Sequence, residues 1–528
     1  MEKIKNFISS HKVILSCVAI LAVLVASVLV FSWIGLWYAI ILAAIVGISL
    51  TGMKKHGLLK ILTILMLLIM LLSNVLPGRQ EIVDRIGVAD LLVNYFSIVL
   101  QNFSYIVLFV LVIGGFYGVL NKTASYKKLL DTIVTKLKPN GKRAVFVIMI
   151  LFAVIASLTG MTVPLFIFIP FVASIILLLG YDKLVAFSAT FGSTMIGYIG
   201  GVFVSFINPN TYKITTFDEF VGLETKFTNV FPKLLLLFAG ITLLIYFVSK
   251  HIKSVEEKKV KYELSDNSDL LIAEVKGEYK NIKTWPLITI LSLIFVILVI
   301  GIIPWQGLFG IDVFNKFHTW LNGLSIKGLE VFPSIISANL PALGGWYDSG
   351  NFMAIYVYAG MLVLFATVLV MITNKIKVNE ALDNFLDGSK KLIPAAFLIS
   401  LAFCVLVCAY NNGFFELIIT KSGKFNYALS SLYAFIGCIL NVDTTWITAG
   451  IMSQITNLIT DESIYSSVAV LFQGIYGIFM LVGPTSLFLI LGLSYLDIPY
   501  TTWLRYIWRF ILALIILLAL VVLLVTIL

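Results

Sequence analysis

Apolar residues gather in long runs over the whole chain, and short polar segments separate them. Many runs reach about 18 residues, the length an α-helix needs to cross the hydrocarbon core of a bilayer. The pattern predicts an all-α polytopic membrane protein with about 12–14 hydrophobic segments. Candidate spans, several of them shorter than about 18 residues and so not all full crossings, lie near residues 13–33, 36–53, 57–76, 103–120, 144–158, 165–180, 184–207, 234–249, 286–303, 352–373, 392–409, 427–440, 445–459, 466–481, 484–496 and 504–528.

The composition points to the same class. Of 528 residues, 60% are hydrophobic and 12% are charged, whereas a soluble domain is about half apolar and a quarter charged. The first apolar run follows a basic start and is 19 residues long, which is longer than the apolar core of a secretory signal. We therefore expect this run to be retained as the first span.

The net charge of +10 is concentrated in short segments between the predicted spans. This is the positive-inside pattern, which places such segments in the cytoplasm. Membrane topology therefore explains the excess of basic residues without any binding to nucleic acid. We expect the N-terminus to be cytoplasmic as well. The basic clusters consist of Lys54, Lys55 and Lys60, then Lys122, Lys127, Lys128, Lys136, Lys138, Lys142 and Arg143, and then Lys375, Lys377, Lys390 and Lys391.

A charged segment divides the chain near its middle. Residues 250–284 hold eight Lys and seven acidic residues, which predicts a cytoplasmic linker. Before it we expect N-terminal scaffold or accessory spans at 1–102 and a first repeat at 103–249. After it we expect a span with an interfacial or extracytoplasmic segment at 285–351 and a second repeat at 352–528.

Each predicted repeat contains two polar interruptions in the same order. The first has "LTGMTVP" (158–164) and then "SFINPNT" (205–211), and the second has "LNVDTTW" (440–446) and then "LVGPTS" (481–486). About 40 largely apolar residues separate the members of each pair. Paired polar tips and Pro-broken helices are typical of transporters built from inverted repeats, with re-entrant hairpins and discontinuous helices. Pro kinks are also common in ordinary membrane helices, so one break alone would indicate little.

The breaks matter because lipid cannot form hydrogen bonds with free backbone groups. A Pro frees carbonyls that can bind a cation, and the next half-helix offers amides to a carboxylate. The predicted substrate-binding residues are Thr159, Thr162, Asn208, Asn210, Thr211, Thr444, Thr445, Thr485 and Ser486. The predicted coupling-ion residues are Asp443, Asn441, Asn208 and Gly483.

Asp443 is the acidic residue that stands out, because it has apolar flanks and two neighbouring threonines. Intramembrane carboxylates are rare and usually functional. Asp443 could bind Na⁺, carry a coupling proton or pair with a substrate amine. The alternative is that it lies in an exposed loop between two spans.

Other classes of function find less support in the sequence. The four Cys and four His show neither metal-ligand spacing nor a CxxC motif, so we expect no metal beyond a coupling Na⁺. We find no nucleophile paired with a base, no HExxH and no phosphate loop, and therefore expect neither an enzyme nor a cofactor. An ion channel remains an alternative, although paired breaks favour a closed, alternating site.

Several stretches resemble the YfcC-like and anaerobic four-carbon dicarboxylate carrier (DcuC) family. They are "VIGGFYGVLNKTASYKKLLDTIVTKLK" from Val112, "LLLGYDKLVAFSATFGSTMIGYIGGVFVSFINPNT", "GWYDSGNFMAIYVYAG", "FLDGSKKLIPAAFLI" and "LVGPTSLFLILGLSYLDIPYTTWLRY". The resemblance spans most of residues 103–528. It implies a member of the ion-transporter superfamily, with inverted repeats, a homodimeric assembly, and a scaffold part beside a transport part that moves like an elevator.

By this resemblance the hairpin tips map to Thr159–Pro164 and Asn441–Trp446, and the unwound helices to Ile207–Thr211 and Gly483–Ser486. The first tip lacks the family's acidic residues, and Asp443 stands in the second, where the family usually has serines. The sequence therefore predicts a secondary transporter, by symport or antiport, for an amino acid or C4-dicarboxylate in a bacterial plasma membrane. An exchanger of basic amino acids is the alternative within this class.

Overall fold

The computed structural model describes much of the chain after its first spans. The described residues are 57–75, 86–87, 89–202, 205–207, 214–221, 223, 227–259, 262, 264, 270–271, 273, 275, 282–303, 305–306, 310–331, 354–411, 427–440, 459 and 461–527. The spans predicted at 13–33, 36–53 and 445–459 lie wholly or almost wholly outside them. So do the predicted site residues Asn208, Asn210, Thr211, Asn441, Asp443, Thr444 and Thr445.

The described residues are almost entirely helical, as predicted. The helices are α4 (Gly57–Val75), α5 (Phe96–Leu120), α6 (Ala124–Leu137), α7 (Gly141–Thr159), α8 (Ile169–Leu178), α9 (Lys183–Phe187), α10 (Ser193–Ile199), α11 (Phe217–Phe220), α12 (Phe227–Glu256), α13 (Trp285–Ile302), α15 (Val313–Asn322), α16 (Ala354–Thr373), α17 (Val378–Asn411), α19 (Tyr427–Leu440), α22 (Tyr465–Val482), α23 (Leu487–Tyr495) and α24 (Tyr500–Ile527). Short 3₁₀ or π segments are η1 (Asp90–Tyr95), η2 (Lys138–Asn140), η3 (Val163–Ile167), η4 (Ser188–Gly192) and η7 (Glu462–Ile464).

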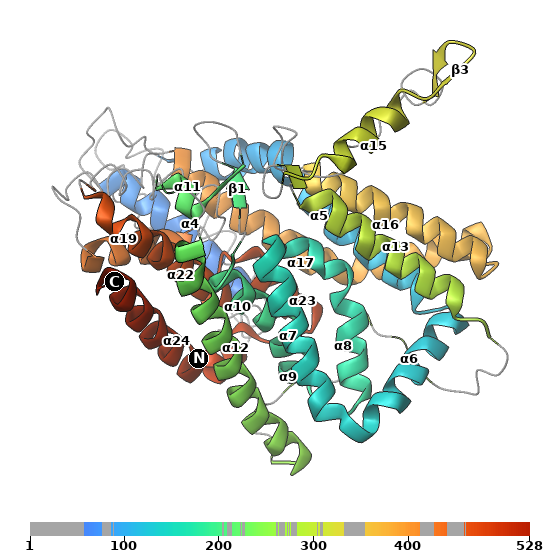
Figure 1. The fold of residues 1–528 in the computed structure, drawn as a ribbon, viewed down its shortest axis with the longest axis horizontal. Helices are drawn as coiled ribbons and strands as arrows, with labels where there is room; N and C mark the ends of the chain where they lie inside the picture. Colours follow the sequence, from blue (N-terminus) through green and yellow to red (C-terminus); the bar gives the residue numbers. More distant parts are fainter. Residues whose placement is uncertain are drawn as a thin grey trace, which may run out of the picture.

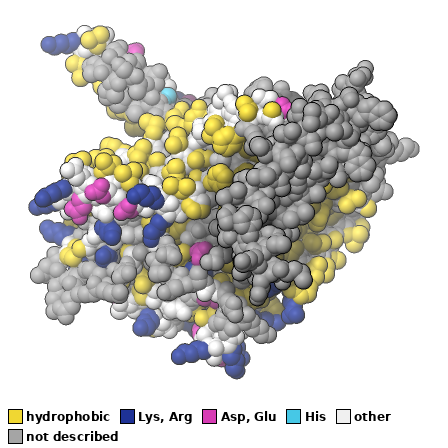
Figure 2. All heavy atoms as spheres, turned by 180° about the vertical axis from the view of Figure 1, so that it is seen from behind, with side chains coloured by type: hydrophobic (Ala, Val, Ile, Leu, Met, Phe, Trp, Pro, Cys, Tyr) yellow, Lys and Arg dark blue, Asp and Glu magenta, His cyan; other side chains and the backbone are white. Residues whose placement is uncertain are grey.

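Within this described part, eight helices are long and apolar enough to cross a membrane. Their outer faces carry exposed apolar side chains, such as Phe365 and Ile372 on α16 and Leu520 on α24. Figure 2 shows a broad hydrophobic surface, with many of the Lys and Arg side chains toward its lower and left edges. Such a surface would be unfavourable in water and is expected against lipid. The protein is a multi-pass membrane protein.

By their contacts, the helices form two packed bundles. The first bundle consists of α4, α5, α13, α16 and α17, with α5 against α17 at its centre. The second bundle consists of α7, α9, α10, α12, α22, α23 and α24. Each bundle takes helices from both sides of the charged segment, so the two halves of the sequence are intertwined in space.

Glycines bring α5 and α17 into close contact in the first bundle. A Cβ atom at Gly118 would lie 2.1 Å from the carbonyl oxygen of Asn384, and one at Gly388 would lie 2.1 Å from that of Gly114. Small residues allow such close approach of membrane helices. Ser389 Oγ adds a hydrogen bond of 2.9 Å across the contact to the Leu111 carbonyl.

Aromatic rings fill the centre of the second bundle. Phe187 packs on Phe191 and Trp503, with ring centroids 5.0 and 4.3 Å apart, and Phe191 packs on Phe488 at 4.7 Å. The cluster joins α9 and η4 to α23 and α24, which are more than 290 residues away in sequence. Burial of several rings makes this contact a major source of the bundle's stability.

The bundles meet along α17 and α23 and around η3. At η3, the buried Tyr117 hydroxyl of α5 donates a hydrogen bond of 2.7 Å to the Ile167 carbonyl. Phe168, directly after η3, packs edge-on against Phe295 of α13 at 5.6 Å. The contact is thus largely apolar, with few specific polar ties among the described residues.

The structure differs from the sequence prediction at the first Pro break. We expected a broken membrane helix at Ile207–Thr211, but α10 ends at Ile199 and strand β1 (Ser205–Ile207) pairs antiparallel with β2 (Ile214–Thr216). Gly200 and Gly201 disfavour continuation of the helix. The β-branched residues on either side of Asn-Pro-Asn then favour a hairpin. Residues 208–213 between the strands lie outside the described residues.

The predicted charged linker, residues 250–284, overlaps the end of α12. Helix α12 continues to Glu256, so the first residues of the 250–284 segment are helical. Further along, Leu270, Leu271 and Ala273 are buried, and Lys391 Nζ donates to the Leu270 carbonyl at 3.0 Å. Part of this segment therefore packs on the helices. On the other side of α13, helix α15 and a hairpin of β3 (Ser325–Ile326) and β4 (Leu329–Glu330) project from the body (Figure 1).

Candidate transport site

The helix break predicted at Gly483–Ser486 is present and lies inside the second bundle. Helix α22 ends at Val482, α23 starts at Leu487, and all four residues between them are buried. Pro484 cannot donate an amide to the preceding turn, which ends the helix here. Ser486 then starts the next helix, because its Oγ accepts a hydrogen bond from Leu489 N at 3.3 Å. Irregular backbone at membrane depth is tolerated when protein surrounds it in this way.

The carbonyls freed by this break are already bonded to side chains. Met480 O accepts from Ser486 Oγ at 2.9 Å, Leu481 O accepts from Trp503 Nε1 at 2.7 Å, and Val482 O accepts from Tyr500 OH. Two of the three donors come from α24. The sequence analysis expected such carbonyls to be available for a cation, and the structure instead shows a locked helix end. The predicted role of Gly483 in ion coupling gains no support from this geometry.

Thr485 connects the break to the second predicted tip. Its Oγ1 donates to the Ile439 carbonyl at 3.1 Å, at the end of α19. Helix α19 ends at Leu440, one residue before the Asn441–Trp446 tip. The tip itself lies outside the described residues. Thr485 and Ser486 nevertheless lie beside its start, so the break and the base of the tip are neighbours.

The first predicted tip, Thr159–Pro164, is a turn between α7 and η3. Thr159 Oγ1 donates to the Ile155 carbonyl at 2.6 Å and accepts from Met161 N at 3.1 Å. Gly160 takes the left-handed conformation with φ of 66°, which ends α7. The Thr159 hydroxyl is therefore used within the turn. Thr162 is half-buried and caps η3 without a side-chain hydrogen bond.

The end of α10 lies next to this turn. Ser157 Oγ donates to Gly200 O at 2.9 Å, and Val202 N donates to Ser157 O at 3.0 Å. From α22, Gln473 directs its Nε2 to the carbonyls of Tyr198, Ile199 and Gly201 at 3.2, 3.3 and 2.7 Å. The ends of α7 and α10 and the middle of α22 thus share one buried polar region. Sequence reasoning missed Gln473, a polar residue within an apolar span.

A buried ion pair is the second feature that the sequence analysis missed. Lys233 Nζ of α12 lies 2.6 Å from Asp218 Oδ2 of α11, and both side chains are 2% exposed. The sequence "FPKLLLL" places Lys233 at the start of an apolar run, where the pattern alone does not distinguish it from a residue at the end of a span. The pair lies near the end of α10, since a Cβ atom at Gly200 would lie 2.5 Å from the backbone of Leu237, one turn after Lys233.

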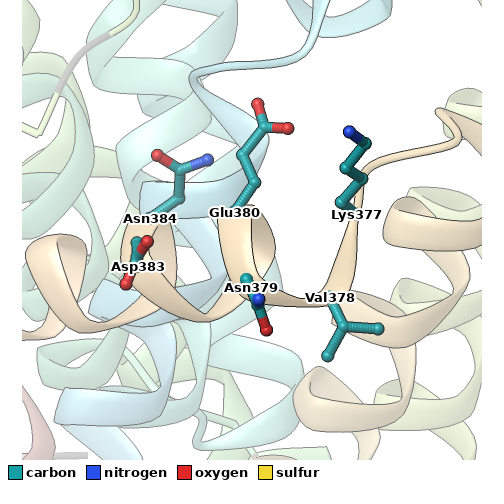
Figure 3. A pocket seen from close by; sticks show the side chains of 6 residues that line it. All are labelled: Lys377, Val378, Asn379, Glu380, Asp383 and Asn384. Atoms are coloured by element: carbon teal, nitrogen blue, oxygen red, sulfur yellow. The ribbon is translucent and has the colours of Figure 1, made fainter.

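An open hollow of about 590 Å³ lies elsewhere, at the start of α17 (Figure 3). Lys377, Glu380 and Asn384 point to one side of the helix there, while Asp383 lies on another. It contains none of the predicted site residues. Among the described residues, no group of three or more His, Cys, Asp or Glu could hold a metal ion. The buried polar region of the second bundle is therefore the better candidate for transport.

Comparison with known proteins gives the context for this site. The family model for the C4-dicarboxylate anaerobic carrier, DcuC, matches residues 13–527. A protein of Haemophilus influenzae described as uncharacterized is 22% identical over 334 residues, which cover 62% of this chain and 55% of the relative. The match thus spans about half the length of that curated relative. The crystal structure of the YdaH transporter of Alcanivorax borkumensis is 13% identical, with a TM-score of 0.35, covering 88% of this chain and 97% of that chain.

The family match extends over nearly the whole chain and includes both predicted repeats, the charged segment between them and every element of the buried polar region. The chain belongs to the C4-dicarboxylate anaerobic carrier family.

Proposed function

We propose that this protein is a secondary active transporter for a C4-dicarboxylate in a bacterial plasma membrane. The observation that carries the proposal is the buried break between α22 and α23, within a chain that the carrier family matches from residue 13 to 527. A soluble ligand needs polar groups at membrane depth, and such groups are tolerated only around a protein-enclosed site. The proposal follows from the break rather than from the surface hollow at α17.

The carboxylate would bind at the start of α23. The first amides of a helix have no acceptor within it, and the helix dipole favours a negative charge there. Thr485 and Ser486 are buried at this point, next to the base of the second predicted tip. Thr444 and Thr445 of that tip would complete the site, and Thr162, Asn208, Asn210 and Thr211 would contribute from the first repeat. The two carboxylates of a dicarboxylate would occupy both sets of residues.

Transport would follow an elevator mechanism. The second bundle contains the polar region and meets the first bundle through a mainly apolar contact. We propose that the first bundle is the scaffold, that a second copy of the chain completes a homodimer, and that the second bundle moves. Coupling to Na⁺ or H⁺, or exchange of one solute for another, would drive the movement. Asp443 and Asn441 remain proposed coupling residues.

An amino acid is the second candidate substrate. It is favoured by Asp443, a carboxylate that could pair with the amino group of aspartate while helix amides hold its carboxylates. A plain dicarboxylate has no group for such a pair. The two candidates therefore differ in what Asp443→Asn should do to the choice between malate and aspartate.

The test is uptake of labelled malate, succinate, aspartate and arginine into proteoliposomes. Each is measured with and without a Na⁺ gradient, a pH gradient, and unlabelled solute inside. Saturable uptake of malate or succinate, competed by the other, is the expected result. Uptake of aspartate that is lost in Asp443→Asn would instead favour the amino-acid carrier. Unsaturable flux would indicate a channel, and tight vesicles without uptake of any of the four would refute the proposed function.

A further inference from the structure

The carbonyl oxygens at the end of α10 point into the second bundle and converge. Those of Tyr198, Ile199 and Gly201 all lie within 3.3 Å of Gln473 Nε2, and all three residues are buried. A helix that ends inside a membrane protein directs its negative dipole end at this point. Three oxygens and a helix end therefore create a region of negative potential around one small volume.

The Gln473 side chain occupies this volume, but its amide group does not form all the hydrogen bonds it could. Its amide nitrogen carries two hydrogens, and three carbonyls share them. Its Oε1 atom is buried and has no hydrogen-bond partner among the described residues, although the residue is 1% exposed. A buried acceptor without a partner has lost its hydrogen bonds to water and gained none in the protein, which lowers stability. Such a cost is unusual in a packed core and points to a ligand that the acceptor meets in another state.

We propose that the end of α10 is a binding site for a monovalent alkali cation, Na⁺ in a cell, with the carbonyls of Tyr198, Ile199 and Gly201 and Gln473 Oε1 as ligands. Rotation of the Gln473 amide about its terminal bond exchanges Nε2 for Oε1. The nitrogen then no longer donates to the carbonyls, and the cation takes its place. The oxygen then binds the cation, while the amide nitrogen turns to the side where the oxygen had no partner, so the gain comes from the ion's bonds to the four oxygens.

The charges around this point suit a monovalent ion. Lys233 lies one turn of α12 before Leu237, the residue that packs against Gly200. Lys233 and Asp218 form an ion pair, so their charges offset each other. The ligands themselves are neutral oxygens, whereas divalent cations are usually held by carboxylates. Unwound backbone and the C-terminal ends of half-helices coordinate Na⁺ in transporters. This site uses different residues from the proposed coupling residues Asp443 and Asn441.

The inference deepens the proposed function, because it supplies the ion that would couple to dicarboxylate transport. It also connects the two repeats physically. The carbonyls come from the first half of the chain and Gln473 from the second, so a bound cation fixes α10 against α22. Binding would then favour one arrangement of the second bundle over another.

The experiment measures cation binding without substrate. The purified full-length protein is heated in detergent at pH 8 with 0–200 mM NaCl, and N-methyl-D-glucamine chloride keeps the ionic strength constant. We expect a saturable rise in Tm of about 3 °C, as linkage between binding and folding requires. Gln473→Leu should lose this rise. Gln101→Leu, the same change at an exposed residue of α5, should keep it.

Gln473→Glu keeps the test decisive if Gln473→Leu does not fold. An ionised carboxylate cannot donate to the carbonyls, so this variant should be less stable than wild type without Na⁺ and should show a larger rise with it. No Na⁺-specific rise in wild type would overturn the inference. A rise unchanged in Gln473→Leu, or one no larger in Gln473→Glu than in wild type, would place the ion elsewhere. Malate uptake is measured separately, so failure of transport and failure of this site give different results.

Discussion

Burial of the Lys233 charge is unfavourable by itself, and its ion pair with Asp218 offsets that cost. The ammonium group is buried in an apolar helix and lies 2.6 Å from Asp218. Removing one partner leaves the other charged and desolvated, which typically costs about 3–5 kcal/mol. We expect Lys233→Met and Asp218→Asn each to lower Tm strongly, whereas the double variant should recover much of the loss. Thermal unfolding of the four proteins in detergent measures this coupling.

A matched control for that cycle lies on α17. Lys390 and Asp387 are 3.0 Å apart, but their side chains are 68% and 71% exposed. Because water screens such pairs, Lys390→Met should change stability by less than about 0.5 kcal/mol. If the double variant at Lys233 and Asp218 were as unstable as the sum of the single variants, the pair would not be coupled and the argument from burial would be wrong.

The hydrogen bond of Thr485 leads to a prediction about the effect of this single residue on transport. Its hydroxyl donates to the Ile439 carbonyl beside the second predicted tip. Thr485→Val keeps the shape of the side chain but loses the donor, at a cost of about 1 kcal/mol, or about a fivefold change in an equilibrium constant. We expect the KM for malate to rise by about this factor, and Thr485→Ser to behave like wild type. Equal KM values for both variants would remove Thr485 from the site.

At the scale of elements, the α5–α17 contact depends on glycines that admit no side chain. A Cβ atom at Gly118 would lie 2.1 Å from the backbone oxygen of Asn384, which cannot move aside as a flexible side chain would. We expect Gly118→Ala to push the helices apart and lower Tm by several degrees. At Gly360 of α16 the nearest atom would be 3.8 Å away, so Gly360→Ala should be neutral. Similar Tm values for the two variants would contradict this packing argument.

The sequence pattern predicts long elements well because residues close to each end determine where a helix begins and ends. The predicted spans at 57–76, 286–303 and 466–481 differ by one or two residues from α4, α13 and α22. Pro484 marks the α22–α23 break correctly, because Pro prevents the helix hydrogen bond wherever it occurs. Pro209 lies outside the described residues, but the strands that flank it are not the membrane helix that the sequence predicted there. There the neighbouring glycines and β-branched residues favour a hairpin, and the choice depends on what packs around it.

The contacts of the site could not be predicted from sequence in the same way. Gln473 and the end of α10 are about 270 residues apart, and no local pattern links them. The same holds for Trp503 and Tyr500, whose hydrogen bonds occupy the carbonyls at the end of α22. Their side chains look like ordinary interfacial aromatics in the sequence. Only the fold shows that they lock a helix end.

For the whole molecule, the two bundles offer a physical basis for movement. Tyr117 OH to Ile167 O is a specific tie between them, while most of the contact is apolar. An apolar helix surface gains no hydrophobic energy by exchanging lipid for apolar protein. Such a contact therefore does not strongly fix the position of one bundle against the other. If the elevator proposal holds, Tyr117→Phe should change the rate of transport more than the affinity for solute. Initial rates and KM values from the same uptake assay separate the two effects.

The orientation of the molecule in the membrane follows from its charges. Lys258 lies in the turn after α12, close in sequence to Lys253 and Lys259, whereas Lys327 lies in the β3–β4 turn of the projecting arm, and both are exposed. Helix α13 separates the charged segment from the arm, so one crossing of the membrane lies between them. Basic segments stay in the cytoplasm. We therefore expect Lys258 inside the cell and Lys327 outside.

Cysteine labelling tests this orientation directly. Cys404, Cys408 and Cys438 are buried, so a background that lacks only Cys17 should react little with a membrane-impermeant maleimide. Lys327→Cys should then be labelled in intact cells, and Lys258→Cys only after the cells are permeabilised. The reverse result would place the basic ends outside the cell and invert the proposed orientation. Labelling of both in intact cells would mean that α13 does not cross the membrane, and the assignment of spans around the charged segment would have to change.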